Sequence, residues 1–175
     1  MTDMTLIKPT FEYATQIFEY RQEFLDSEDS MDGCGPLRRC KNPEEYLAIC
    51  KQYENSETVP ENLVPATQFL LIRQCDNRLV GMIQIRHCFN EYLEKYAGHI
   101  GYSIRPSERK KGYAKRMLKM ALPFCKELGL QKVLISCNDT NIGSEKTIIA
   151  NGGVYESTVT EPNTNRDLKR FWIEL

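Results

Sequence analysis

Hydrophobic positions along the chain follow two different periods. In four segments, apolar residues recur at steps of three and four, which predicts amphipathic helices, and these span residues 9–26, 42–53, 112–128 and 141–150. In seven shorter segments, β-branched, aromatic and aliphatic residues gather between turn residues, which predicts strands. These span residues 5–7, 67–75, 78–89, 98–105, 131–137, 154–160 and 168–174.

Local signals mark where several of these elements begin and end. Asn42-Pro43-Glu44-Glu45 is typical of a helix start, with an N-cap, a proline in the first turn and acids near the positive end of the dipole. Asp76-Asn77 predicts a hairpin turn, because both residues tolerate positive φ. Gly129 is placed to end the third helix in a left-handed conformation. The polar stretches 26–42 and 54–66 are expected to be loops.

The order of elements predicts the fold class. Early helices precede an antiparallel meander, and strands then alternate with helices before two final strands. We expect one α/β domain over residues 1–175, in which helices cover both faces of a central mixed, mostly antiparallel sheet.

Composition narrows the class of protein. The chain has 175 residues, 41% hydrophobic and 27% charged, with a net charge of −1, so no global field draws it to nucleic acid or to a membrane surface. Its apolar runs are too short to span a bilayer, and its first residues lack the pattern of a signal peptide. Seven cysteines without C-x-x-C spacing and two histidines predict reduced, mostly buried thiols in a cytoplasmic protein and no metal site.

One local cluster of basic residues carries the chemistry. The predicted strand 98–105 stops at Pro106, a short charged loop follows, and a helix opens at Gly112. A helix N-terminus has free N–H groups and a positive dipole, and glycine lets an anion come close, so the segment predicts a site for a diphosphate. The alternative is a solvated basic helix start. The pattern is neither a P-loop nor a dinucleotide-binding G-x-G-x-x-G, and a nucleic-acid patch lacks a wider basic face.

Arg109-Lys110-Lys111-Gly112-Tyr113-Ala114 resembles the R/Q-x-x-G-x-G/A signature of the GNAT acetyltransferases. The surrounding order of elements is also similar to that family. The segments GHIGYSIRPSERKKGYAKRMLKMAL, VLISCNDTNIGSEK and NGGVYES resemble a bacterial branch of predicted acetyltransferases. The resemblance implies the GNAT fold, with six to seven strands and about four helices, and acetyl-CoA as co-substrate without a metal.

The resemblance also assigns residues to the binding of CoA. The backbone of the loop and helix start would bind the pyrophosphate, which involves Arg109, Lys110, Lys111, Gly112, Tyr113 and Ala114. The strand edge at Tyr102 and Ile104 would pair with the pantetheine arm, and a backbone N–H there would hold the oxyanion. Asn141 and Ser144 would contact CoA at the fourth helix, where Asn141 is equally suited to be an N-cap.

The catalytic acid and base are harder to place. Many relatives carry a tyrosine in the fourth helix as general acid, but Ile148 occupies that position here. Tyr155 is the candidate substitute for the acid. The alternative for Tyr155 is a packing role in the core. His99 is the candidate base, since the pKa of a histidine suits that role. The alternative is a structural role, because strand alternation places His99 on the opposite face from Ile100, Tyr102 and Ile104 unless a bulge intervenes. Arg86 is a candidate to bind a carboxylate of the acceptor.

The expected activity is acetyl transfer from acetyl-CoA to a primary amine of a small molecule or peptide, by direct attack in a ternary complex. The alternative is a non-catalytic acyl-CoA-binding domain, favoured by the absent tyrosine. Six acids between residues 19 and 32 (Glu19, Glu23, Asp26, Glu28, Asp29 and Asp32) would attract a cationic acceptor if they line the site, or are simply solvated. A homodimer is compatible with the family, and no nucleic acid or membrane partner is expected.

Overall fold

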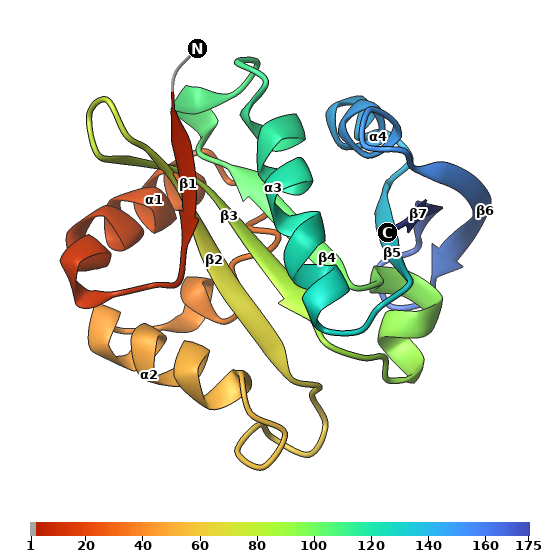
Figure 1. The fold of residues 1–175 in the computed structure, drawn as a ribbon, viewed down its shortest axis with the longest axis horizontal. Helices are drawn as coiled ribbons and strands as arrows, with labels where there is room; N and C mark the ends of the chain where they lie inside the picture. The colour runs from red at the N-terminus through yellow and green to blue at the C-terminus, as the bar shows by residue number, and fades with distance from the viewer. Residues whose placement is uncertain (1–2) are drawn as a thin grey trace.

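The computed structural model describes residues 3–175 and contains two antiparallel sheets, side by side in Figure 1. The first has the order β1-β2-β3-β4 and the second the order β5-β7-β6. The strands of the first are β1 (Met4–Ile7), β2 (Ala66–Arg73), β3 (Arg78–Arg86) and β4 (Ile100–Ile104). Those of the second are β5 (Lys132–Asn138), β6 (Val154–Glu161) and β7 (Arg166–Glu174). The expected α/β fold with seven strands is confirmed.

The expectation of one continuous sheet is wrong at the boundary between β4 and β5. These strands form no ladder within the described residues, and the isolated antiparallel bridge Gly98↔Ile135 joins the two sheets just before β4 begins. Gly98 has a φ of 74°, a left-handed conformation that glycine adopts without strain. The backbone therefore turns sharply at the bridge, and the two sheets separate beyond it.

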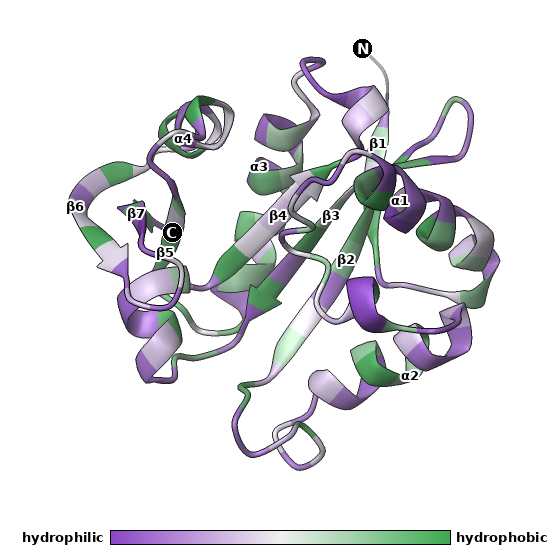
Figure 2. Ribbon diagram, turned by 180° about the vertical axis from the view of Figure 1, so that it is seen from behind, coloured by the Kyte–Doolittle hydropathy of each residue, from purple (hydrophilic) through white to green (hydrophobic). Residues whose placement is uncertain are grey.

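Helices cover both faces of the first sheet. On one face lie α1 (Ala14–Asp26), which follows a 3₁₀ turn at Phe11–Tyr13, and α2 (Pro43–Tyr53). Figure 2, seen from behind, shows this face. On the other face lies α3 (Tyr113–Glu127), while α4 (Ile142–Ile149) lies beside β5 and β6.

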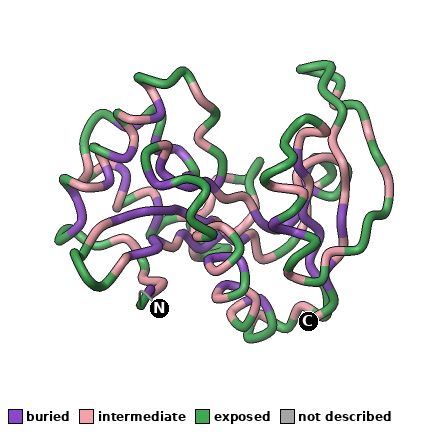
Figure 3. The backbone as a smooth tube through the Cα atoms, turned by 90° about the horizontal axis from the view of Figure 1, so that it is seen from above, coloured by how far each residue is buried: buried purple, intermediate pink, exposed green. Residues whose placement is uncertain are grey.

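Two hydrophobic cores follow from this arrangement. One contains Tyr20 and Phe24 of α1, Tyr46 of α2, and Leu70 and Met82 of the sheet. The other is built on Met117 and Leu118 of α3 and includes residues of both sheets, such as Ile83 and Phe171. Figure 3 shows the buried central strands and the exposed loops around them. The second core therefore joins the two sheets.

Some of the caps and turns predicted from local sequence are confirmed and others are not. The N-cap at Asn42 is confirmed, since its Oδ1 accepts a hydrogen bond from the Glu45 N–H at 2.8 Å. The turn between β2 and β3 is longer than the expected two residues, because the strands end at Arg73 and resume at Arg78. Asn77 has positive φ there and Asp76 does not. A π-helical turn at Leu93–Ala97 was not expected from the sequence.

Across residues 3–175, none of the helices is long and apolar enough to cross a membrane. The expectation of mostly buried thiols is confirmed, because five of the seven free cysteines are buried and only Cys75 and Cys88 are exposed.

Candidate functional site

The edge of β4 that faces β5 presents backbone groups with which no strand of residues 3–175 forms a ladder. β3 and β4 pair without a register shift, and the Arg105 N–H donates to the Val80 carbonyl at 2.9 Å. Backbone groups alternate in direction along a strand, so the N–H and C=O groups of Gly101, Ser103 and Arg105 point toward β3. The N–H and C=O groups of Ile100, Tyr102 and Ile104 therefore point away from β3, toward the side of β5.

The two sheets are held together by His99 at one end of the gap between β4 and β5. Its N–H donates to the Leu134 carbonyl of β5 at 2.7 Å, and its ring Nδ1 accepts from the Leu134 N–H at 3.0 Å. The imidazole is 5% exposed and stacks on Phe89 with ring centroids 3.9 Å apart. Burial, together with the nearby Arg86 guanidinium, lowers the pKa of His99 to about 4. These contacts favour the structural role for His99 over that of a base.

The alternation predicted for β4 is confirmed. Ile100 and Ile104 pack in the core under α3, with Tyr102 against it. Ser103 faces the opposite side, where its hydroxyl is 3.0 Å from the Tyr20 hydroxyl of α1.

The loop after β4 forms a cradle of backbone N–H groups at the start of α3. Lys110 and Gly112 have φ values of 63° and 79°, and Gly112 is the N-cap of α3 without a side-chain cap. A Cβ added at Gly112 would meet no described atom within 4 Å, so the space in front of the helix is open. An uncapped helix start with an open approach is suited to an anion.

The side chains of this loop are largely engaged in ion pairs that hold its shape. Glu108 is 5% exposed, and its carboxylate lies 2.7 Å from an Arg73 nitrogen and 2.8 Å from Lys111 Nζ. Burial would raise the pKa of Glu108, but these two cations outweigh it and the pKa is lowered. Arg109 pairs with Asp29, lies over the Phe24 ring and donates from Nε to the Ile104 carbonyl at 3.2 Å.

The acidic run of α1 and its loop meets the basic cluster. Glu23 lies 3.5 Å from an Arg105 nitrogen and accepts from the Ser107 hydroxyl at 2.8 Å, while Asp29 pairs with Arg109. These acids thus hold the loop between β4 and α3, so fewer acids of the run are available to attract a cationic acceptor than the sequence alone indicated.

On the other side of the gap, α4 approaches β4 through a tyrosine. The Tyr102 hydroxyl is 2.8 Å from the Ser144 hydroxyl, in the first turn of α4. Asn141 caps that helix, because its Oδ1 accepts from the Ser144 N–H at 3.0 Å, as in the N-cap interpretation. The structure therefore brings Tyr102, Asn141 and Ser144 together.

The two positions considered for a general acid differ in setting. Ile148 is fully buried in the core of α3 and both sheets. Tyr155 is 53% exposed on β6, and its hydroxyl is 2.9 Å from the Thr158 hydroxyl. Since β7 lies between β6 and β5, Tyr155 is separated by two strand spacings, about 10 Å, from the strand that borders the gap.

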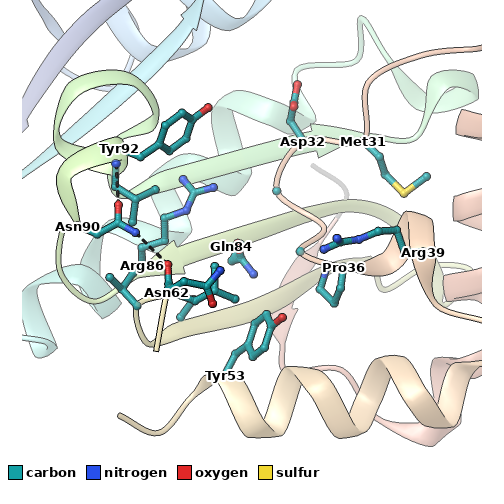
Figure 4. Close-up of a pocket in the computed structure, with 16 residues that line it drawn as sticks. Met31, Asp32, Pro36, Arg39, Tyr53, Asn62, Gln84, Arg86, Asn90 and Tyr92 are labelled. Atoms are coloured by element: carbon teal, nitrogen blue, oxygen red, sulfur yellow. Dashed lines mark hydrogen bonds between the residues drawn. The ribbon is translucent and has the colours of Figure 1, made fainter. Parts of the chain in front are cut away.

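A cavity of about 490 Å³ lies on the α1 and α2 face of the sheet, beyond the ends of β2 and β3. Three segments far apart in the sequence line it: the loop after α1, the loop after α2, and the end of β3 with the turn at Asn90–Leu93. Figure 4 shows Arg86 and Arg39 directed into it from opposite sides. Apart from Arg86 and Asp32, these lining residues were not singled out from the sequence, because they form no local motif.

Comparisons with known proteins agree with this architecture. A family profile described as an acetyltransferase (GNAT) domain matches residues 4–154. A search of curated proteins by sequence finds no significant match.

Three solved structures show the fold. A ribosomal L7/L12 α-N-protein acetyltransferase in complex with coenzyme A has a TM-score of 0.73 and 14% identity, and the alignment covers 100% of this chain and 96% of that one. The microcin C7 self-immunity acetyltransferase in complex with acetyl-CoA and AMP has a TM-score of 0.71 and 15% identity, covering 99% and 93%. A dodecameric spermidine N-acetyltransferase from Vibrio cholerae has a TM-score of 0.67 and 15% identity, covering 98% and 93%.

Proposed function

The chain belongs to the GNAT family of acetyltransferases, and we propose that it transfers the acetyl group of acetyl-CoA to a primary amine in a ternary complex. The observation that carries the proposal is the uncapped start of α3 beside the free edge of β4. The start of α3 suits a diphosphate and the edge of β4 suits a chain that carries amide groups, and CoA contains both. The acceptors named for similar folds, a ribosomal protein and spermidine, differ too much to select one here.

The binding of CoA follows from the two free sets of backbone groups. The N–H groups of Lys110 through Ala114 would hold the pyrophosphate, with Gly112 leaving room for it, while the Arg109 N–H donates to the Pro106 carbonyl at 3.4 Å. The outward N–H and C=O groups of Tyr102 and the N–H of Ile104 would pair with the pantetheine arm as a further strand does, while the Ile104 carbonyl already accepts from Arg109 Nε. Ser144 and Asn141 would border the arm from α4.

The chemistry then takes place where β4 and β5 separate. An outward N–H of β4 would stabilise the oxyanion of the tetrahedral intermediate, an interaction worth about 3 kcal/mol in other acyl transfers. The CoA thiolate is a moderate leaving group, since the pKa of a thiol is about 8.5. Transfer is therefore feasible although Ile148 replaces the tyrosine of relatives, and Tyr155 stays a prediction for the acid.

We propose that His99 positions β4 against β5 instead of deprotonating the amine. A base with a pKa of about 4 is poorly matched to an ammonium of pKa about 10.4. Both the ring and the backbone of His99 are bound to Leu134. Loss of this residue would therefore change where the oxyanion donors of β4 lie.

Buried thiols do not favour a covalent acyl-cysteine route. Burial raises the pKa of Cys34, Cys50 and Cys125 to about 12, so these groups stay protonated and weakly nucleophilic at neutral pH. Direct attack by the amine is therefore the simpler mechanism.

Calorimetric titration of acetyl-CoA into wild type and Gly112→Trp tests the binding site. Gly129→Trp is a matched control, because Gly129 also has positive φ and open space but lies beyond the other end of α3. We expect wild type and Gly129→Trp to bind and Gly112→Trp to lose at least tenfold in affinity. Equal binding by all three would refute the cradle.

Release of free thiol with a panel of amines tests the activity. Turnover with any primary amine supports the transferase. Binding of acetyl-CoA without turnover by any amine would favour the second candidate, a non-catalytic acyl-CoA-binding domain, for which Ile148 at the tyrosine position is the supporting observation.

A further inference from the structure

We infer that the acceptor amine carries a carboxylate, and that Arg86 binds it in the 490 Å³ cavity on the α1 and α2 face. The inference rests on the proposed function and names the class of its acceptor: an amino acid or a short peptide with a free carboxyl group.

Arg86 joins the cavity to the strand on which transfer would occur. It is the last residue of β3, and its Nη1 donates to the Gly98 carbonyl at 3.2 Å, directly before β4. A Cβ added at Gly101 would lie 3.4 Å from Arg86 Nη2, so the guanidinium lies against the β4 backbone. A group bound by Arg86 would therefore hold the rest of the acceptor next to the acetyl group.

Within residues 3–175, no ion pair neutralises the charge of Arg86, unlike that of comparable arginines. Arg105 pairs with Glu23, and Arg73 pairs with Glu108. In the described part of the chain, Arg86 forms no ion pair, and its one recorded hydrogen bond uses one of five donors. Burial lowers the pKa of Arg86, and the opposing effects of Tyr92 and Asp32 offset that shift only in part.

Asp32 and Tyr92 act on the charge of Arg86, but within residues 3–175 neither forms an ion pair with its guanidinium. Asp32 lines the cavity but is exposed and accepts a hydrogen bond from the Ser30 hydroxyl at 2.9 Å. The Tyr92 hydroxyl, at the rim, donates to Glu161. Neither fills the position in front of the guanidinium, which points into the cavity in Figure 4.

A second cation makes the cavity complementary to an anion. Arg39 lines the opposite side and, among residues 3–175, has no recorded ion pair. The charged lining residues are Arg39, Arg86 and Asp32, which is two cations against one anion. Tyr53 and Gln84 direct polar groups to the same space in Figure 4 and could orient a carboxylate or a peptide group.

The fork of an arginine favours a planar carboxylate. A guanidinium donates two parallel hydrogen bonds to a carboxylate, and such a contact in a half-buried site discriminates strongly against analogues that lack the charge. The volume of about 490 Å³ is in the range of small-molecule sites and accommodates an amino acid or dipeptide.

The first experiment compares matched acceptors in wild type. The twenty free amino acids and a set of dipeptides are assayed by thiol release beside their C-terminal carboxamides, with aminoalkyl phosphates and spermidine as further arms. We expect kcat/KM for the best free acid to exceed that of its carboxamide by about tenfold to a hundredfold. Preference for the phosphate arm, for the carboxamide or for spermidine overturns the carboxylate assignment, as does an absence of turnover and of binding by every free acid.

The second experiment tests Arg86 itself. Arg86→Gln should raise KM for the free acid about tenfold or more, and lower kcat/KM for the carboxamide by a much smaller factor. Lys126→Gln, an exposed cation in the last turn of α3, is the matched control and should change neither. If Arg86→Gln does not fold, Arg39→Gln on the exposed side of the cavity should show a smaller shift of the same kind.

The two proposals fail in different ways. If only the carboxylate assignment is wrong, acetyl-CoA binding and amine turnover are normal but depend neither on Arg86 nor on a carboxylate in the acceptor. Failure of the proposed function appears as no acetyl-CoA binding, or as binding with no turnover of any amine.

Discussion

His99→Asn separates a structural from a catalytic role for the histidine between the sheets. The Asn Oδ1 can replace ring Nδ1 as acceptor for the Leu134 N–H, so the junction keeps its hydrogen bond. The substitution removes the titrating group and the ring stacked on Phe89.

The expected pH effect follows from the lowered pKa. In the unfolded chain the histidine has a pKa of about 6.5, and in the folded protein burial lowers it to about 4. The unfolded state therefore binds the proton more tightly, so stability is lost as the pH falls from about 6.5 to about 4. The 2.5-unit difference corresponds to about 3 kcal/mol when the pH lies below both values.

Urea unfolding followed by fluorescence of the single tryptophan measures this term. Trp172 has its ring centroid 6.5 Å from that of His99, so it reports on the junction. Wild type should lose about 3 kcal/mol more than His99→Asn between pH 7 and pH 4, since the carboxylates common to both proteins cancel. At pH 7.5, kcat should fall less than about tenfold. Equal pH dependence in the two proteins, or a fall in kcat of about 10² or more, would refute the structural role and restore His99 as base.

Two further substitutions test the supports of the site. Glu23→Gln removes the anion beside Arg105, which is 3% exposed. The free energy of unfolding, measured with urea, should fall by about 1–3 kcal/mol, and acetyl-CoA binding should weaken. Unchanged stability would show that the Gln16 carbonyl suffices as a partner for Arg105. Gly98→Ala would place a Cβ 2.3 Å from the Leu134 carbonyl oxygen, at a residue with a φ of 74°. We therefore expect the free energy of unfolding to fall by about 2 kcal/mol or more and kcat to fall as well. A variant as stable as wild type would contradict the close approach of the two backbones.

The features that could be predicted from the sequence depend on neighbours along the chain. The cap at Asn42, the alternation of Ile100, Tyr102 and Ile104, and the glycine at the start of α3 all follow from local rules. The π-helical turn at Leu93–Ala97 lacked such a signal, because a five-residue segment is too short for periodicity to show.

The features that could not be predicted join distant segments. The ion pair of Asp29 and Arg109 spans 80 positions, and no local pattern indicates that the two charged runs meet. The same holds for the cavity, whose lining comes from three separate segments. Separation of the sheets at Gly98 was also missed, since a glycine before a strand does not by itself say on which side the next strand will pair.

The meeting of the charged runs changes the meaning of the basic cluster. The sequence indicates that cations around Gly112 attract phosphate, but Arg105, Arg109 and Lys111 are paired with Glu23, Asp29 and Glu108. What remains for an anion is chiefly the backbone at the start of α3, whose N–H groups need no side-chain charge. Pairing of the side chains therefore does not abolish the site. It holds the loop in the left-handed turns at Lys110 and Gly112, so we expect Glu23, Asp29 and Glu108 to act on CoA binding through the shape of the loop.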